Sequence, residues 1–348
     1  MSGLSIIEGP YCRDILDQPR ALRETVAGLA TESGMDVIAS KLRAGQFDRV
    51  VLTGMGSSYH ALHPLNLTLG ELSYTPVMVE TSELVHYQTH LLTPRTLVIA
   101  VSQSGRSVEI TRLLESNRTQ HTVIGVTNYS DSPLATASNS VVLTRAGEEF
   151  SVSCKTYVST LVALHWLASI FAGADLNATR RELEAVVPAV EGYLRDWRTH
   201  VAKLASCLEH IEHLFIVGRG SSLATVGTGG LTIKESDHVH AEGMSSAAFR
   251  HGPFEMLNEY TFVLVCSGGH KTRDLNLGLV RDLKEFGARC AYIGENAPDA
   301  ELRLPAIAPA LRPIMEILPV QMITLALAAN DNREAGKFVR ATKVTTVE

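Results

Sequence analysis

The sequence predicts an α/β protein made of two doubly wound domains, each a mainly parallel sheet flanked by helices. The length of 348 residues is enough for two domains of ordinary size. The segment VVLTGMGSS at Val50–Ser58 returns as LFIVGRGSS at Leu214–Ser222, which indicates an internal repeat. In both copies a β-branched apolar run meets G-x-G-S-S and then a helical pattern. That order is typical of the strand, tight turn and helix start of a doubly wound unit.

The repeat divides the chain into four segments. We expect an N-terminal helical segment over residues 1–45, the first domain over 46–175, a helical linker over 176–203, and the second domain with a C-terminal tail over 204–348. The linker is assigned because charged residues recur at helical spacing between Asn177 and Lys203.

The remaining strands are expected where apolar residues form short continuous runs. These runs are Pro76–Val79, Leu97–Val101, Val123–Val126 and Val141–Leu143 in the first domain, and Phe262–Cys266 and Cys290–Ile293 in the second. Continuous rather than alternating apolarity suits a parallel sheet covered on both faces. A long helix after Lys155 closes the first half, and Pro313–Ala329 is expected to form the last helix.

Composition argues against several classes of partner and site. The formal net charge is −6 and no run of Lys or Arg exceeds a pair, so we expect no nucleic-acid partner. The cysteines form no C-x-x-C pair, which argues against a disulfide framework or a zinc site and indicates reduced core thiols. They are Cys12, Cys154, Cys207, Cys266 and Cys290.

The chain shows no sign of export or of membrane insertion. Its N-terminus lacks the basic start and apolar stretch of a secretory signal. The most apolar segment, Tyr157–Ala174, carries serine, threonine and histidine side chains, which favours a buried helix. We therefore expect a cytoplasmic protein without a membrane partner.

A serine-rich turn in the first domain is the strongest candidate for an anion site. The segment VIAVSQSGRSVEI at Val98–Ile110 places its serines, Gln103 and Gly105 where a strand ends and a helix begins. Helix N-terminal amides carry partial positive charge, small residues let the backbone approach, and hydroxyls add donors, so this turn can hold a phosphate without lysines. The alternative is an ordinary turn in which serine caps the helix.

The glycine turns of the repeat give a weaker signal. Gly54–His60, GMGSSYH, could cradle another part of the ligand, with Ser58 reaching a hydroxyl or phosphate oxygen. Tyr59 stands where the dinucleotide fingerprint needs its third glycine, so a nicotinamide cofactor is not expected. The alternative, above all for the second copy at Gly218–Ser222, is a tight turn with a serine N-cap.

Acidic and basic groups are concentrated in Ile233–Leu257, where glycines and a proline imply a partly irregular backbone. The groups are Glu235, His238, His240, Glu242 and His251. Acids and bases beside a ligand suit proton transfer. A metal site is the alternative, but histidines at i, i+2 do not share a helix face, so no metal is expected.

These motifs, together with the hydroxyl-rich tail around Lys343, resemble a known family: proteins with two sugar isomerase (SIS) domains in tandem, as in the isomerase half of glutamine:fructose-6-phosphate amidotransferase. G-x-G-S-S-Y-H, S-Q-S-G-x-S, K-E-x-x-x-x-H-A-E with R-H-G-P following, and the terminal K-x-x-T-V-E occur in the family's order and at its approximate spacing. The resemblance covers the chain from about Gln46 onward.

The resemblance implies a role for each candidate residue. Glu235 would be the base that moves a proton between C1 and C2, and His251 would assist ring opening in the active site of a partner subunit. Lys343 would form or stabilise an imine with the open-chain ketose. The family also implies a homodimer with shared active sites and no cofactor. The sugar or aminosugar phosphate would be held by Ser58, Ser102, Gln103, Ser104, Ser107 and Val152.

Departures from the family narrow the expected reaction. A chain that starts at Met1 has no room for the glutaminase domain, and Cys12 lacks the N-terminal position of that domain's nucleophile. In the serine-rich turn, Arg106 stands where the family has an acidic residue. Near the expected base, Thr232 stands where the synthase has a lysine. Glutamine-dependent synthesis is therefore not expected.

The sequence favours the stand-alone branch of the family. We expect an amino-sugar phosphate deaminase that converts glucosamine 6-phosphate to fructose 6-phosphate and ammonia. The alternatives are a fructosamine-6-phosphate deglycase, a plain ketose/aldose phosphosugar isomerase and, in a different class, a non-catalytic phosphosugar sensor. The sensor is disfavoured because the chain lacks a helix-turn-helix pattern and retains Glu235, His251 and Lys343.

Overall fold

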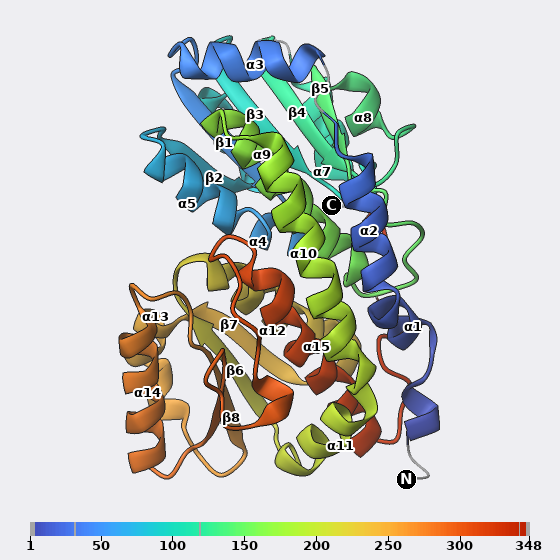
Figure 1. Ribbon diagram of the computed structural model, residues 1–348, viewed down its shortest axis with the longest axis vertical. Helices are drawn as coiled ribbons and strands as arrows, with labels where there is room; N and C mark the ends of the chain where they lie inside the picture. The colour runs from blue at the N-terminus through green and yellow to red at the C-terminus, as the bar shows by residue number, and fades with distance from the viewer. Residues whose placement is uncertain (1–3, 31–32, 118–119, 341, 346–348) are drawn as a thin grey trace. The chain divides into compact units, whose positions relative to one another are not determined.

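The computed structural model describes residues 4–30, 33–117, 120–340 and 342–345, which fall into two compact units (Figure 1). The β1–β5 unit contains the described residues of 18–149, 155–187 and 341–348. The β6–β9 unit contains the described residues of 1–17, 150–154 and 188–340. Each unit has one parallel sheet flanked by helices, so the predicted fold class is confirmed.

The β1–β5 unit is built on a five-stranded parallel sheet in the order β2-β1-β3-β4-β5. The strands are β1 Arg49–Gly54, β2 Pro76–Glu80, β3 Thr96–Val101, β4 Thr122–Thr127 and β5 Ser140–Leu143. Each apolar run predicted in this half lies within one of these strands. Strand β3 is buried along its whole length, as expected for a parallel strand covered on both faces.

Helices cover both faces of this sheet. On one face, Leu84, Ile110 and Leu134 pack against Val51 and Val98 of the strands. The long helix predicted after Lys155 is α9, which packs against α2, α3, α5 and β4 and lies in front of the sheet in Figure 1. The helices of this unit are α2 Gln18–Gly28, α3 Ser33–Arg43, α4 Ser57–His60, α5 His63–Glu71, α6 Thr81–His86, η2 Thr89–Leu91, α7 Val108–Glu115, α8 Pro133–Ala137 and α9 Lys155–Ala172.

The β6–β9 unit repeats this plan with a four-stranded parallel sheet in the order β7-β6-β8-β9. Its strands are β6 His213–Gly218, β7 His240–Ser245, β8 Thr261–Cys266 and β9 Arg289–Ile293. Its helices are η1 Leu4–Ile7, α1 Pro10–Leu16, α11 Trp197–Cys207, η4 Gly220–Ser222, α12 Leu223–Asp237, α13 Ser246–Arg250, η5 Pro253–Met256, α14 Arg273–Glu285, η6 Ala300–Leu302 and α15 Arg312–Asn330.

Strand β7 is the element that sequence patterning missed. Its sequence, HAEGMS, has no apolar run, and the region around it was expected to be partly irregular. Helix α12 crosses the strand so closely that a Cβ on Gly243 would lie 2.0 Å from the carbonyl oxygen of Val226. Glycine is therefore required here for the close approach of a helix to a strand, and not because the backbone is irregular.

Between Leu176 and Lys203 the chain is helical, with α10 Leu176–Arg195 followed by α11 from Trp197. The expectation about the cysteines needs correction. The five cysteines are free thiols, but they are not all in the core. Cys207 is exposed because it is the last residue of α11 and lies at the helix end, and Cys290 is only partly buried.

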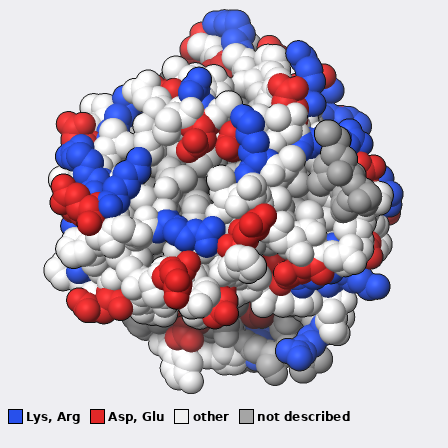
Figure 2. Space-filling view, turned by 90° about the horizontal axis from the view of Figure 1, so that it is seen from below, with Lys and Arg blue, Asp and Glu red and all other residues white. Residues whose placement is uncertain are grey.

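Helix α15 is the one helix of the described chain that is long and apolar enough to cross a membrane, and 89% of its apolar 18-residue stretch is buried inside the structure. Such burial is typical of a core helix, and α15 packs against α11 and α12. On the face shown in Figure 2, Lys and Arg side chains lie among Asp and Glu side chains, without an extended area of one sign.

The strand orders place one topological switch point in each sheet. In the β1–β5 unit it lies between β1 and β3, because the chain leaves β1 toward β2 on one side and returns to β3 on the other. In the β6–β9 unit it lies between β6 and β8. Ligands of open α/β sheets bind at the carboxyl ends of the strands beside such a point.

Candidate active site

Two of the predicted motifs meet at the switch point of the β1–β5 unit. The turn GMGSS follows β1 and the turn SQSGRS follows β3, and the ends of these strands are paired with Gly54 opposite Val101. A Cβ on Gly54 would lie 3.0 Å from the Val101 carbonyl oxygen, so a larger residue would force the two turns apart. The first glycine turn of the repeat and the serine-rich turn therefore form one candidate site.

The turn after β3, residues 102–107, winds tightly around its own hydroxyls, and we call it the phosphate loop. The Gly105 amide donates to Ser102 Oγ at 3.1 Å, and the Arg106 amide donates to Ser104 Oγ at 3.2 Å. Gly105 has a φ of 61°, and a Cβ there would lie 2.4 Å from Ser132 Oγ. Conformation and space therefore both require glycine at this position.

The hydroxyl of Ser107 is not used to cap the following helix. Ser107 is the N-cap residue of α7, yet its side chain makes no capping hydrogen bond. For Ser58 Oγ, too, no hydrogen-bond partner is found in the part of the chain that the structure describes. Both hydroxyls lie at the switch point and remain able to donate to a ligand, which weakens the alternative of a simple serine cap.

The C-terminal tail brings Lys343 to this same unit. The Val108 amide, in the first turn of α7, donates to the carbonyl oxygen of Thr345 at 3.3 Å. Lys343 Nζ lies 2.5 Å from Glu149 Oε2, and the Lys343 side chain is only 24% exposed. Lys343 is thus held beside the phosphate loop and is not a solvated tail lysine; Thr346, Val347 and Glu348 of the terminal motif lie outside the described residues.

Glu149 is a candidate that sequence reasoning missed. Its side chain is fully buried, and it accepts hydrogen bonds from the Thr156 amide at 3.0 Å and from Thr156 Oγ1 at 2.6 Å. Burial opposes ionisation of the carboxyl, but the charge of Lys343 and the hydrogen bonds from Lys343 and Thr156 outweigh it. Together they hold the pKa of Glu149 below its usual value.

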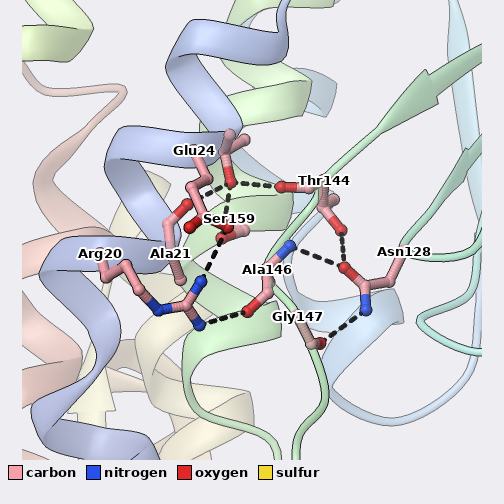
Figure 3. A network of polar contacts seen from close by, with 9 residues as sticks. Arg20, Ala21, Glu24, Asn128, Thr144, Ala146, Gly147 and Ser159 are labelled. Carbon is pink, nitrogen blue, oxygen red and sulfur yellow. Dashed lines mark hydrogen bonds and ion pairs between the residues drawn. The ribbon is translucent and has the colours of Figure 1, made fainter.

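Asn128 binds the segment that leads to Glu149 through its side chain (Figure 3). Its Nδ2 donates to the Gly147 carbonyl at 2.8 Å, and its Oδ1 accepts from Thr144 Oγ1 at 3.0 Å and from the Ala146 amide at 2.8 Å. Its own amide donates to the Gln103 carbonyl at 3.1 Å. Asn128 thus binds residues 144–147 through its side chain and the loop through its backbone amide.

Helix α2 supports the same segment from its other side, as Figure 3 also shows. Arg20 Nη2 donates to the Ala146 carbonyl at 3.4 Å and forms an ion pair with Glu24 through Nη1 at 2.7 Å. The buried Thr25 hydroxyl contacts the Thr144 carbonyl and lies 2.9 Å from Ser159 Oγ. The segment that precedes Glu149 is therefore anchored from two elements.

Replacing Asn128 with Ala is expected to loosen this segment. The change removes three side-chain hydrogen bonds, so the free energy of local opening should fall by about 1–3 kcal/mol. Hydrogen exchange of the amides of residues 144–149 should then be about 10-fold faster or more. Asn139→Ala is the control because Asn139 Oδ1 accepts one bond, from the Val123 amide at 2.8 Å. Equal acceleration of residues 144–149 in both variants would contradict the assignment.

The other three predicted residues lie in the β6–β9 unit. Glu235 is partly buried in the last turn of α12, and His251 is exposed just after α13. Val152 is fully buried, so neither its side chain nor its backbone is exposed in this conformation. Within that unit, Asp237 is only 2% exposed, which keeps it away from a ligand, and burial raises its pKa to about 8, although Ser236 and Arg333 oppose the rise.

The second copy of the glycine turn differs from the first. Ser222 is fully buried and donates to Glu316 Oε1 at 2.9 Å, while Thr225 donates to Glu316 Oε2 at 3.2 Å. Burial raises the pKa of Glu316 to about 7, although Arg312 and these hydroxyls oppose the rise. Ser222 therefore serves a buried side-chain network in place of a ligand or a helix cap.

No group of three or more His, Cys, Asp or Glu side chains with metal-binding geometry is found among the residues that the structure describes. The two histidines that raised the metal alternative are exposed: His238 ends α12, and His240 begins β7 and lies against His213 at 3.3 Å between their Nδ1 atoms.

A family model described as "SIS domain" matches residues 46–170 and again residues 208–330. Each match contains one of the two parallel sheets. A curated relative, the isomerizing glutamine–fructose-6-phosphate aminotransferase of Pyrobaculum aerophilum, is 30% identical over 349 residues. That alignment covers 97% of this chain and 57% of the relative, so the chain spans little more than half the length of the relative.

Solved structures share the fold over nearly the whole chain. The C-terminal domain of glucosamine-fructose-6-phosphate aminotransferase from Francisella tularensis gives a TM-score of 0.84 at 20% identity, covering 95% of this chain and 98% of that one. Glucosamine-6-phosphate deaminase from Thermotoga maritima gives 0.79 at 19% identity, covering 97% and 100%. At these identities the likeness concerns the fold.

Proposed function

Because this chain belongs to the SIS-domain family, we propose that it is an enzyme that binds a phosphorylated sugar and interconverts its aldose and ketose forms. The observation that carries the proposal is the position of Lys343. Its amine is paired with a buried carboxylate, and its tail is bonded to the first turn of α7, beside the phosphate loop. A non-catalytic sensor needs the loop but has no use for an amine held there.

Phosphate binding is supported by the geometry of the loop. Among the described residues no internal hydrogen-bond partner is found for the hydroxyls of Ser107 and Ser58, and the N-terminus of α7 adds a favourable dipole. Arg106 forms an ion pair with Asp131 that is exposed on both sides and contributes little to stability. We propose that Ser102, Gln103 and Ser104 complete the cradle.

The chemistry we propose is an enolisation assisted by an imine. Lys343 bonds to C2 of the open-chain ketose, which acidifies the neighbouring proton. Glu235 moves that proton between C1 and C2, and His251 assists ring opening. These two roles rest on the family resemblance, as does the proposal that the protein is a cytoplasmic homodimer.

The most specific form of the proposal is a deaminase that releases ammonia from glucosamine 6-phosphate and leaves fructose 6-phosphate. A solved structure with this fold is named as such an enzyme. A fructosamine-6-phosphate deglycase or a plain ketose/aldose isomerase would use the same loop and base, because all three reactions move a proton between C1 and C2 of a phosphorylated sugar.

The test is ammonia release from the purified protein with glucosamine 6-phosphate, compared with unphosphorylated glucosamine. Rapid release that depends on the phosphate supports the deaminase. Turnover of fructosamine 6-phosphates or of plain ketose phosphates, without ammonia release from glucosamine 6-phosphate, selects an alternative within the same proposal. Absence of turnover with all of these substrates refutes it.

Replacing Ser107 with Ala is expected to weaken binding of the phosphorylated substrate by about 10-fold to 100-fold, because a hydrogen bond to a charged group contributes about 1.5–3 kcal/mol. Titration calorimetry with glucosamine 6-phosphate measures the change. Ser116→Ala, at the other end of α7, is the matched control because its hydroxyl donates to the Leu113 carbonyl at 2.9 Å. If both variants lose the same affinity, Ser107 does not contact the phosphate.

A further inference from the structure

We propose that Glu149 is a catalytic residue of this reaction: it holds Lys343 beside the phosphate loop and accepts the proton that Lys343 must lose before its amine can bond to the sugar. The inference rests on the proposed function, because it concerns how the imine at Lys343 forms. It assigns a role to a residue that no sequence motif marks.

The first support is the burial of the carboxylate. The Glu149 side chain is fully buried and the Lys343 side chain is 24% exposed. The carboxylate is therefore hidden from solvent, while the amine remains within reach of a ligand. A buried carboxylate is costly unless it is paired and hydrogen-bonded. Here Lys343 and Thr156 meet that requirement.

The second support is the fixed orientation of the Glu149 carboxylate. Glu149 Oε1 accepts from the Thr156 amide, at the start of α9, while Oε2 accepts from Thr156 Oγ1 and from Lys343 Nζ. Two contacts to Thr156 fix the plane of the carboxylate, so one oxygen points at the lysine. Lys343 Nζ lies 2.5 Å from Glu149 Oε2, so a proton can pass directly between the two groups.

The third support is the connection between Glu149 and the phosphate loop. Asn128 bonds to the Gln103 carbonyl and also to Thr144, Ala146 and Gly147, which precede Glu149 in the chain. The carboxylate is therefore positioned relative to the loop that would hold the sugar phosphate. The residues named here all belong to the β1–β5 unit.

The proton balance of the step is simple. Lys343 starts as an ammonium and passes one proton to the Glu149 carboxylate. The neutral Nζ then forms a bond to C2 of the ketose phosphate as the C=O π bond breaks, and the oxygen takes the proton back from the Glu149 carboxyl. A second proton leaves nitrogen for Glu149 and is returned to the departing hydroxyl, which leaves as water. The products are a protonated imine at Lys343, an ionised Glu149 and one water.

The experiment measures imine formation directly. The protein is incubated with fructose 6-phosphate and cyanoborohydride, and reduced adduct at Lys343 is quantified by mass spectrometry of the tail peptide. Glu149→Gln keeps the shape of the side chain but cannot accept a proton. We expect its trapping rate and its kcat to fall about 100-fold or more, while the Kd for fructose 6-phosphate changes less than about threefold.

Glu148→Gln is the matched control, because Glu148 is the adjacent residue and is exposed. It should trap at the wild-type rate. A Glu149→Gln variant that traps within about threefold of wild type would overturn the inference. A purely structural role predicts weaker fructose 6-phosphate binding and a lower Tm together with a normal trapping rate per bound ligand, which also overturns it.

A second variant keeps the inference testable if Glu149→Gln does not fold. Glu149→Asp retains the carboxylate but withdraws it by one methylene, so trapping should fall less than in the Gln variant or in Glu149→Ala. Trapping that follows the order Glu, Asp, Ala supports proton acceptance by the carboxylate, and equal trapping by Asp and Ala contradicts it. If wild-type protein neither turns over substrates nor traps, the proposed function itself fails; wild-type trapping without dependence on Glu149 refutes only this inference.

Discussion

The Glu235→Gln variant is expected to lose about 10²-fold to 10⁴-fold in kcat with little change in KM, because glutamine has the shape of glutamate but cannot move a proton between C1 and C2. Glu235 lies partly buried in the last turn of a 15-residue helix, α12, so the substitution should not disturb the fold. Steady-state kinetics with glucosamine 6-phosphate measure the loss, and exchange of the C1 and C2 hydrogens with deuterated solvent should fall in parallel.

Glu242→Gln provides the control for this prediction. Glu242 comes from the same acidic and basic segment, but it is exposed on β7. Its variant should keep wild-type kinetics. If Glu242→Gln loses the activity and Glu235→Gln retains it, the base has been assigned to the wrong carboxylate.

The Lys343→Ala variant is expected to lose at least about 10²-fold in kcat, because the reaction then lacks the amine that forms the imine. It should also be less stable at neutral pH, since Glu149 stays buried without its counter-charge. Without the charge and the hydrogen bond of Lys343, which both lower the pKa of Glu149, that pKa should rise. Ammonia release and thermal unfolding measure the two effects separately.

Lys343→Arg separates the chemical role of the lysine from its charge. Arginine keeps a cation for Glu149, so stability should stay close to that of the wild type, but a guanidinium does not form an imine. Activity should therefore fall as far as in the Ala variant. Lys337→Ala, an exposed lysine just before the tail, should leave both properties unchanged. Full activity of the Arg variant would show that only the charge matters.

The fold was predictable where local sequence controls structure. Continuous apolar runs such as Leu97–Val101 are strands because both faces of a parallel sheet are covered, and residue order alone identifies them. Strand β7 was missed because what makes it a strand is pairing with β6 along the whole of HAEGMS, together with a close helix crossing at Gly243. Neither leaves an apolar pattern in the sequence.

In the candidate site, too, some parts could be predicted from local sequence and others could not. The phosphate loop is one continuous segment, so its glycine and hydroxyls stand out in the sequence and the structure gives them a conformation that needs glycine. Glu149 and Asn128 could not be predicted, because their importance lies in contacts with residues far away in the chain, such as Lys343 for Glu149. Pairing across such a distance appears only when the chain has folded.

The two glycine turns of the repeat have the same sequence motif, but their serine side chains differ in hydrogen bonding. Among the described residues no hydrogen-bond partner is found for Ser58 Oγ in the first copy, whereas the second copy buries Ser222 against Glu316. A hydroxyl that is reserved for a ligand adds no internal hydrogen bond to the empty protein, which is one form of the general trade-off between activity and stability. A duplicated fold can meet both needs, because one copy of the serine remains for the proposed ligand and the equivalent serine of the other copy stabilises a buried network.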